Sequence, residues 1–207
     1  MSEEIRVMMV DDHPLMREGI AAVIEQAEGM TVVGQAHNGS EAIERYRQCR
    51  PDVTLMDLQM PDMNGIDTIK AIRVEFPNAR FIVLTTYQGD VQALRALKAG
   101  AAGYLLKNMI WKDLPDSIRV VHSGRRKIPP EVAAALAEHV TDDLLSEREL
   151  EVLRRVAVGT SNKVIAAELA VSEATIKAHM KSILSKLGAN DRTHAVTIAI
   201  KRGFLDG

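Results

Sequence analysis

The sequence predicts an α/β domain with a doubly wound, five-stranded parallel sheet, followed by an all-α domain of four helices. In residues 1–124, short apolar runs alternate with amphipathic stretches, which is typical of right-handed βαβ units. The central runs are almost continuously apolar, as expected for strands that helices cover on both faces. Residues 144–207 show only helical patterns, so a second domain of a different class follows.

The elements of the first domain are delimited by apolar runs and by residues that start or stop helices. Strands are expected over residues 5–10, 30–36, 53–56, 80–85 and 103–106, and helices over residues 14–28, 40–50, 65–75, 90–98 and 110–123. Pro14 suits the first position of a helix and Gly29 its end, while Ser40 suits an N-cap. Pro77 and Gly124 stop two later helices, so the domain is expected to end at residue 124.

Residues 125–143 are expected to form a linker. They contain Arg125-Arg126-Lys127, Pro129-Pro130 and Thr141-Asp142-Asp143. Between these segments, the alanine-rich stretch from Glu131 to Val140 predicts a short helix.

Four helices are expected in the second domain, residues 144–207. Ser146 and Glu149 form a capping box that opens the first helix, and Gly159 ends it. The others are expected over residues 162–169, from the cap Ser172 to Leu187, and from the cap Asp191 to near Gly203.

Length and composition favour one or two domains with a sizeable core, since the chain has 207 residues and 46% are hydrophobic. No apolar run approaches the roughly 20 residues that cross a bilayer, and residues 1–4 lack the apolar core of a signal peptide. Cys49 is the only cysteine, which excludes an intramolecular disulfide and fits the reducing cytosol. No second Cys or His lies at metal-site spacing from His13 or His37. We therefore expect a cytoplasmic protein without a membrane segment or a histidine-based metal site.

Charge is distributed unevenly, although the net charge is only −2. Residues 1–143 hold 16 Lys and Arg against 21 Asp and Glu, a net of −5, whereas residues 144–207 hold 10 against 7, a net of +3. A basic domain attracts polyanions and an acidic domain repels them. The sequence therefore predicts that only the C-terminal domain meets a polyanion.

Polar residues stand at the C-terminal ends of four expected strands: Asp11 and Asp12, Asp57, Thr85, and Lys107. Ligands of parallel sheets bind beyond these ends, at the switch point of the strand order, so these side chains are expected to gather. A carboxylate is a weak nucleophile and needs a cation that neutralises charge during phosphoryl transfer. The set predicts phosphoryl transfer to Asp57, with Lys107 and Thr85 on the phosphate oxygens. Asp12, Asp57 and a nearby main-chain carbonyl are the expected ligands of Mg²⁺.

The third helix of the C-terminal domain combines an apolar stripe with a basic opposite face. The stripe consists of Ile176, Met180, Ile183, Leu184 and Leu187, and the outward face carries Lys177, Ala178, Lys181 and Ser185. In the major groove, lysine reads guanine edges and alanine contacts a thymine methyl, so Lys177, Ala178 and Lys181 are the expected base contacts. The residues better placed for DNA phosphates are Asn162, Lys163, Thr175 and His179.

Residues 1–124 resemble the receiver domain of bacterial two-component response regulators, which has a flavodoxin-like fold. The resemblance is carried by Asp11-Asp12, Asp57, Met60-Pro61-Asp62-Met63-Asn64-Gly65, Thr85 and Gly103-Tyr104-Leu105-Leu106-Lys107. Residues 146–203 resemble the LuxR-type helix-turn-helix. Here the matching stretches are Leu145-Ser146-Glu147-Arg148-Glu149-Leu150-Glu151-Val152-Leu153, Ser161-Asn162-Lys163 and Thr175-Ile176-Lys177-Ala178-His179. The combination is similar to regulators of the NarL/FixJ type and covers nearly the whole chain.

The resemblance implies a transcriptional regulator, not an enzyme, in which a sensor histidine kinase phosphorylates Asp57. It implies that Asp12 and Asp57 ligate Mg²⁺ and that Asp11 places a water. It also implies that the main-chain carbonyl of Gln59 is a further ligand.

The resemblance further implies how phosphorylation controls DNA binding. Thr85 and Tyr104 would form a switch pair, in which the hydroxyl moves to the phosphate and the ring turns into the vacated space. Phosphorylation would promote a homodimer that binds promoter DNA and works with RNA polymerase. Pairing is expected through the last helix, where Ala195, Val196 and Ala199 allow close approach.

Two other interpretations remain: an aspartyl-nucleophile phosphohydrolase similar to the haloacid dehalogenases, and a receiver that binds proteins without being phosphorylated. The first family has a second Asp two residues after the nucleophile, where this chain has Gln59. The acidic pair, Thr85 and Lys107 argue against the second. The chain departs from its family at Asn108, where many receivers have a cis-proline, and at Val164, where the helix-turn-helix usually has Glu.

Overall fold

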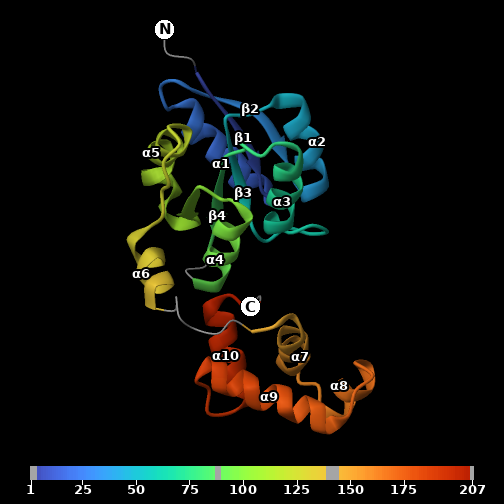
Figure 1. Cartoon of the computed structure of the whole chain (residues 1–207). Coiled ribbons are helices and arrows are strands. Elements are labelled where there is room, and N and C mark those ends of the chain that lie inside the picture. Colours follow the sequence, from blue (N-terminus) through green and yellow to red (C-terminus); the bar gives the residue numbers. More distant parts are fainter. Residues whose placement is uncertain (1–3, 87–89, 139–144, 206–207) are drawn as a thin grey trace. The chain divides into compact units, whose positions relative to one another are not determined.

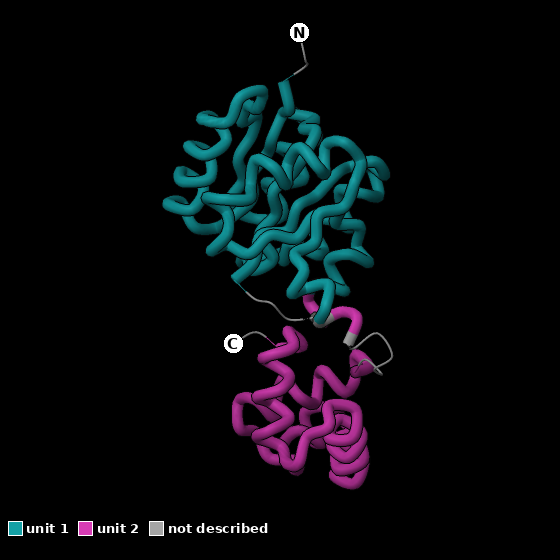
Figure 2. The backbone as a smooth tube through the Cα atoms, turned by 90° about the vertical axis from the view of Figure 1, so that its left-hand side faces the viewer, with its two compact units in different colours: residues 1–88, 93–134 teal, residues 89–92, 135–207 magenta. Residues whose placement is uncertain are grey.

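The computed structural model describes residues 4–86, 90–138 and 145–205. The chain forms two compact units, residues 1–88 with 93–134 and residues 89–92 with 135–207 (Figure 2). Unit 1 contains the sheet, and unit 2 contains the C-terminal helices. Within the described ranges, no helix is long and apolar enough to cross a membrane.

The sheet of unit 1 has five parallel strands in the order β2-β1-β3-β4-β5. In chain order they are β1 (Ile5–Val10), β2 (Met30–Ala36), β3 (Val53–Asp57), β4 (Phe81–Thr85) and β5 (Gly103–Leu106). In the register, Val10 lies opposite Met56, and Thr85 lies opposite Leu106. The strands therefore end at one common edge, and the order reverses between β1 and β3, where a doubly wound sheet binds its ligands.

Helices cover both faces of the sheet (Figure 1). Helix α1 (Pro14–Glu25) packs with α5 (Ile110–His122) on one face, and α2 (Gly39–Cys49) packs with α3 (Gly65–Glu75) on the other. Helix α4 (Asp90–Ala99) follows β4, and a short 3-10 turn, η1 (Lys107–Met109), precedes α5. Strand residues such as Val7, Leu55 and Ile82 are completely buried between these layers. The predicted α/β fold is confirmed.

Most element boundaries expected from the sequence lie close to those in the structure, with some differences. Strand β3 includes Asp57 itself, which the sequence placed just beyond the strand. Helix α2 is capped by Asn38, whose side chain accepts from the amide of Glu41, so the predicted cap Ser40 lies inside the helix. Asn38 has extended backbone angles, which is the conformation that lets a side-chain oxygen reach back to the helix amides.

The first residues of the expected linker belong to unit 1. The amide of Tyr104 in β5 donates to the carbonyl of Lys127 at 2.9 Å, and the amide of Lys127 donates to the carbonyl of Ala102 at 3.0 Å. Helix α6 (Pro130–Glu138) confirms the predicted short helix, and its Val132 is completely buried. Val140, the predicted end of that helix, lies outside the described residues. The chain is therefore fixed to the edge of β5 just after α5.

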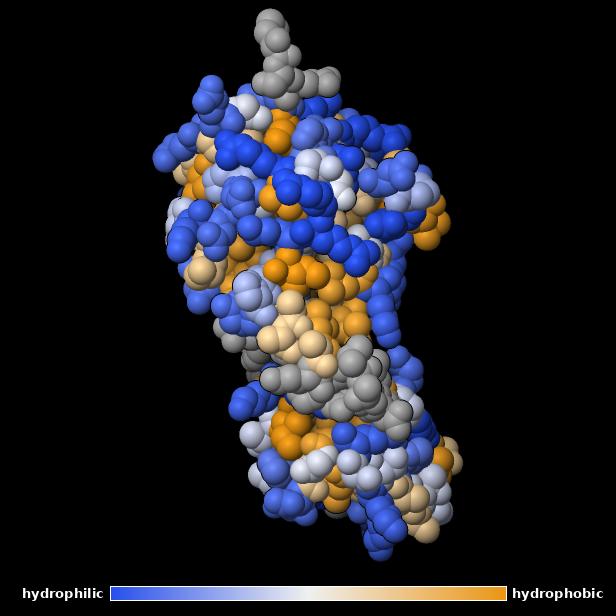
Figure 3. Space-filling view, turned by 60° about the vertical axis from the view of Figure 1, so that its left-hand side comes forward, coloured by the Kyte–Doolittle hydropathy of each residue, from blue (hydrophilic) through white to orange (hydrophobic). Residues whose placement is uncertain are grey.

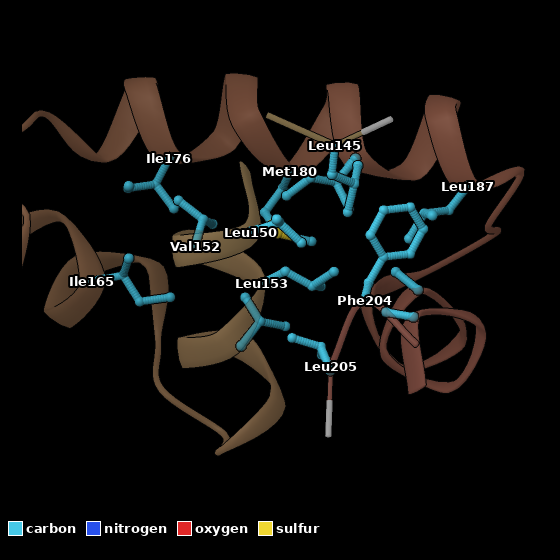
Figure 4. Packing of buried hydrophobic residues seen from close by; sticks show 14 of the residues in the cluster. Leu145, Leu150, Val152, Leu153, Ile165, Ile176, Met180, Leu187, Phe204 and Leu205 are labelled. Carbon is cyan, nitrogen blue, oxygen red and sulfur yellow. The ribbon is translucent and has the colours of Figure 1, made fainter. Parts of the chain in front are cut away.

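Unit 2 contains the four predicted helices: α7 (Glu147–Ala157), α8 (Asn162–Glu168), α9 (Glu173–Leu187) and α10 (Arg192–Arg202). Each has a side-chain N-cap, supplied by Ser146, Ser161, Ser172 and Asp191 respectively. Their apolar faces enclose a common core, and Figure 4 shows side chains of all three helices α7, α8 and α9 meeting there. Phe204 and Leu205 close this core from beyond α10.

Hydropathy alone does not mark a functional site on the surface. In Figure 3, hydrophilic residues predominate on the face in view, and apolar residues form smaller patches. The most exposed large apolar side chains, Leu15, Val74, Trp111 and Val158, come from four different parts of the chain. Buried polar side chains are more informative, because a buried charge is costly unless it is paired. Asp11, Asp57 and Thr85 are in this class.

Candidate functional site

A buried ion-pair cluster lies at the carboxyl edge of the sheet. Asp57 ends β3 and is 3% exposed, and Asp11 follows β1 and is fully buried. The ammonium nitrogen of Lys107 lies 2.7 Å from Oδ2 of Asp57 and 2.7 Å from Oδ2 of Asp11. The strand order brings these groups together because β1 and β3 are neighbours, and the turn after β5 reaches across them. The gathering predicted from the strand ends is observed for all three residues.

The cluster shifts the pKa values of its members. Burial raises the pKa of Asp57, and Lys107 lowers it only in part, so the pKa stays above its ordinary value. Burial acts to lower the pKa of Lys107, but its hydrogen bonds to Asp11 and Asp57 outweigh burial and raise it. Lys107 is thus held in its charged form. The carboxylate of Asp57 is not fully compensated by Lys107, so a further cation would stabilise its ionised form.

The acidic residues fit a hard divalent cation. Ligand atoms of Asp11, Asp12, His13 and Asp57 all lie within 4.8 Å of one another. The buried Oδ1 of Asp12 accepts no hydrogen bond from the described residues, although Nδ1 of His13 is only 2.7 Å away. Carboxylate oxygens in such an arrangement are the ligands that Mg²⁺ prefers, together with waters. The spacing of residues in the sequence did not indicate His13 as part of this group. It lies there because the turn between β1 and α1 brings it back toward the acidic residues.

The loop after β3 determines how Asp57 is presented. The amide of Gln59 donates to Oδ1 of Asp57 at 3.2 Å, while the role of its carbonyl as a ligand remains a prediction. Gly65 starts α3 so close to β3 that a Cβ atom there would lie 2.0 Å from the carbonyl oxygen of Asp57. Only glycine fits at this position, so the Gly65 of the motif is explained by close backbone approach.

The expected switch pair is buried next to the cluster. Thr85 ends β4 and is 3% exposed, and Tyr104 in β5 is 1% exposed. Burial raises the pKa of Tyr104 to about 12, against a lowering effect of its side-chain hydrogen bond with Thr85. The tyrosine ring is therefore buried while it interacts with Thr85, and its movement into the space vacated by the Thr85 hydroxyl stays a prediction.

Arg17 is a site residue that the sequence gave no signal for. Its Nη1 donates to the main-chain carbonyl of Asp11 at 2.6 Å from the first turns of α1. A contact between a helix side chain and a loop carbonyl depends on the path of the loop. Residue type and spacing do not reveal that path.

The helix α9 presents the predicted DNA-binding face. Lys177, Ala178 and Lys181 are exposed, while the inward stripe of Ile176, Met180, Ile183 and Leu187 is buried. The ammonium group of Lys177 pairs with the carboxylate of Glu173 at 2.9 Å, one turn earlier on the helix. The basic face predicted from the sequence is thus open to a ligand, with one of its lysines lightly paired.

The residues predicted for phosphate contacts fall into two groups. Asn162 and Lys163 open α8, and the side chain of Lys163 is exposed. Thr175 and His179 on α9 are only partly exposed, and the hydroxyl of Thr175 is hydrogen-bonded to the cap Ser172 at 2.8 Å. Lys163 is therefore the most exposed of the four. The hydroxyl of Thr175 already takes part in the N-cap of α9.

One expectation about the last helix is wrong. Ala195 and Ala199 of α10 are completely buried in the core of their own unit, because α10 packs on α7 and α9. They cannot form a pairing surface, whereas Val196, the third residue of the expectation, is half-buried. The exposed side of α10 carries Thr193, Thr197 and Lys201 instead.

Comparisons with known proteins agree with both halves of this description. Residues 7–119 match the family model described as response regulator receiver domain, and residues 143–199 match bacterial regulatory proteins of the luxR family. The uncharacterized transcriptional regulatory protein YxjL of Bacillus subtilis is 40% identical over 98% of both chains. The response regulator protein VraR of Staphylococcus aureus is 35% identical over 97% of this chain and 99% of its own.

A solved structure extends the likeness to three dimensions. RcsB of Salmonella enterica serovar Typhimurium, bound to a promoter in the presence of phosphomimetic BeF3-, matches with a TM-score of 0.73 and 31% identity. The match covers 95% of this chain and 98% of that one. The chain belongs to the response regulators that combine a receiver domain with a LuxR-type DNA-binding domain, a family of phosphorylation-controlled transcriptional regulators.

Proposed function

We propose that Asp57 is the phosphoacceptor of this regulator and that its phosphorylation promotes DNA binding by α9 in a homodimer. The observation that carries the proposal is the position of Lys107, 2.7 Å from both Asp57 and Asp11 at the common edge of the sheet. A half-buried ammonium has three N–H donors and here contacts two carboxylates, so it can also bind a phosphate oxygen. The phosphoryl donor is a sensor histidine kinase, as the receiver fold implies.

The chemistry assigned to the site is the transfer of a phosphoryl group to a carboxylate oxygen of Asp57. The phosphorus–nitrogen bond of the donor breaks as the phosphorus–oxygen bond forms. Asp12, Asp57 and the carbonyl of Gln59 would hold Mg²⁺, with Asp11 positioning a water, and this ion supplies charge neutralisation to the transferring group. Lys107 binds one phosphoryl oxygen, and no residue has to act as a general base.

The same site would signal through Thr85 and Tyr104. Once Asp57 carries phosphate, the hydroxyl of Thr85 donates to a phosphate oxygen, which changes its hydrogen bond with Tyr104. A ligand shifts a conformational equilibrium only through its different interactions with the two states. This hydroxyl provides such a difference, because it changes its partner when the phosphate arrives.

In the DNA complex, α9 lies in the major groove. Lys177, Ala178 and Lys181 contact bases, and the residues assigned to phosphates are Asn162, Lys163, Thr175 and His179. Two chains pair through the exposed side of α10 on a promoter, in contact with RNA polymerase. The protein works in the cytoplasm, where promoter DNA is found. The net charge of +3 in residues 144–207 and the match to a promoter-bound RcsB support this assignment.

The test is phosphorylation of the purified chain by a small acyl phosphate with Mg²⁺. We expect one base-labile phosphoryl group on the parent, none on Asp57→Asn, and severe slowing when Mg²⁺ is chelated. Thr85→Ala is the matched variant, because it should take up phosphate normally but respond with weaker dimerisation and DNA binding. Equal labelling of Asp57→Asn contradicts the site assignment, and a parent-like response of phosphorylated Thr85→Ala contradicts the switch.

A further inference from the structure

The loop that carries the acidic pair is attached to the rest of unit 1 through the main chain of Asp11. The amide of Asp11 donates to the carbonyl of Ala36 in β2 at 3.2 Å, which is the last bond of the ladder on this side of β1. The carbonyl of Asp11 accepts from Nη1 of Arg17 at 2.6 Å. The next residues turn away from the sheet, and Pro14 opens α1.

The hydrogen bond from Arg17 satisfies the buried main-chain carbonyl of Asp11. Asp11 is completely buried, so water cannot satisfy its carbonyl, and β1 has ended, so the sheet offers no further amide. A guanidinium donor makes a charge-assisted bond and presents several N–H groups in a fixed plane. Arg17 therefore holds the β1–α1 loop at the residue from which both Asp11 and Asp12 project.

We propose that Arg17 is a positioning residue of the cation site, which it serves by fixing the loop that aims Asp11 and Asp12 at Asp57. This proposal rests on the proposed function, in which these carboxylates hold Mg²⁺. The contact of Arg17 is with a main-chain oxygen, and Lys107 already supplies the cation between the carboxylates. Arg17 thus sets the affinity of the site for the cation, and the phosphoryl group is bound by other residues.

The expected loss of Mg²⁺ affinity follows from residues that support the ligands in other metal sites. Removing a group that orients the ligands lowers metal affinity about tenfold or more. We expect Arg17→Met to weaken Mg²⁺ binding to this degree, because it removes both the donor and the charge. Arg17→Lys keeps a charged donor of similar reach and should recover most of the affinity.

The chain offers a matched control near the other end of α1. Arg119 also donates from its guanidinium to a main-chain carbonyl, that of Glu28, at 3.2 Å. Arg119→Met removes the same type of side chain and the same type of bond, but Arg119 lies on α5 and its acceptor lies beyond the C-terminal end of α1, away from the acidic pair. It should leave Mg²⁺ affinity unchanged.

The experiment measures Mg²⁺ binding to the full chain by isothermal titration calorimetry, for the parent, Arg17→Met, Arg17→Lys and Arg119→Met. Thermal unfolding in a chelator reports the stability of each variant without the ion. Initial rates of phosphorylation by an acyl phosphate are then compared at limiting and at saturating Mg²⁺. We expect Arg17→Met to need about tenfold more Mg²⁺ but to reach nearly the parent rate at saturation.

Two results would overturn the proposal. One is an unchanged Mg²⁺ affinity in Arg17→Met. The other is a low rate that persists at saturating Mg²⁺, which would place Arg17 in phosphoryl transfer itself. If Arg17→Met unfolds in the chelator, Arg17→Gln replaces it, since its shorter neutral side chain removes the guanidinium and its charge, and the same weakening of Mg²⁺ binding is expected. Failure of the proposed function looks different, because then the parent itself binds no Mg²⁺ or Asp57→Asn is labelled.

Discussion

At the scale of the residue, the buried charged groups that the structure describes have several partners each. Lys107 serves two carboxylates in unit 1. In unit 2, Glu149 is 4% exposed and accepts from the amide of Ser146, from the hydroxyl of Ser182 at 2.6 Å and from the ammonium of Lys186 at 2.9 Å. Such a carboxylate links the start of α7 to the C-terminal half of α9, and its loss would leave donors without this acceptor.

The Glu149 network predicts a pH dependence of stability. Burial acts to raise the pKa of Glu149, but its hydrogen bonds with Ser182, Ser146 and Lys186 outweigh burial and lower the pKa from 4.5 to about 2. Because the folded-state pKa is depressed, the stabilisation is complete above the unfolded pKa and is lost as the pH falls toward 2. The full shift would correspond to about 3 kcal/mol, and screening by solvent reduces this contribution.

Urea unfolding followed by far-ultraviolet circular dichroism measures this dependence in the parent and in Glu149→Gln. We expect the parent to lose more stability than the variant between neutral pH and the acid range, since the amide does not titrate. The two curves run parallel if the network contributes nothing. Comparing the two proteins removes the contribution of the other carboxylates.

At the scale of the element, sequence periodicity predicted all five strands and the helices of both units, because these depend on local patterns. Asp57, Thr85 and Lys107 could be identified for the same reason, since a polar residue that ends an apolar run is visible in the sequence. The pairing of Lys127 with β5 could not be predicted, because a short basic segment with prolines nearby gives no strand signal. The bond from Arg17 to Asp11 was hidden in the same way, because it depends on how a loop turns in space.

The first part of α6, up to residue 134, belongs to unit 1, which predicts the effect of a core substitution in the expected linker. Val132 is completely buried, so Val132→Ala should destabilise unit 1 by about 2 kcal/mol. Trp111 on α5 is the only tryptophan, so its fluorescence during urea unfolding reports on unit 1. Ala133→Ser is the control, because Ala133 is exposed on the same helix. Equal stability of Val132→Ala and the parent would mean that Val132 contributes nothing to the stability of unit 1.

At the scale of the whole molecule, the proposed phosphorylation site and the proposed DNA-binding face lie in parts of the chain that differ in net charge and in fold. The proposed phosphoacceptor lies in residues 1–143, which have a net charge of −5, and the predicted DNA contacts lie in residues 144–207, which have a net charge of +3. In the proposed function, phosphorylation of Asp57 adds further negative charge to residues 1–143, while DNA binding belongs to the basic residues 144–207. The proposal therefore assigns control to dimerisation of the chains. The burial of Ala195 and Ala199 restricts that pairing on α10 to its polar, exposed side.

DNA recognition by the whole chain is tested with Lys177→Ala and Lys181→Ala. If either lysine reads a base, its loss should cost about 1–3 kcal/mol and relax the preference at one position of each half-site. If it contacts a phosphate, all sequences should weaken alike and the salt dependence should become shallower by about one unit.

The measurement selects DNA from a randomised pool with the phosphorylated full-length chain and then determines affinity at several salt concentrations. Lys70→Ala is the matched control, because Lys70 is an exposed lysine in unit 1 that pairs with Asp67 much as Lys177 pairs with Glu173. It removes the same charge and the same kind of surface ion pair, but it should change neither affinity nor preference. Half-sites with centres about one helical turn apart, or a multiple of it, would show that two chains bind by symmetry. If affinity and preferred sequence stay unchanged in both α9 variants, this helix does not lie in the groove, and the basic surface of unit 2 must bind DNA elsewhere.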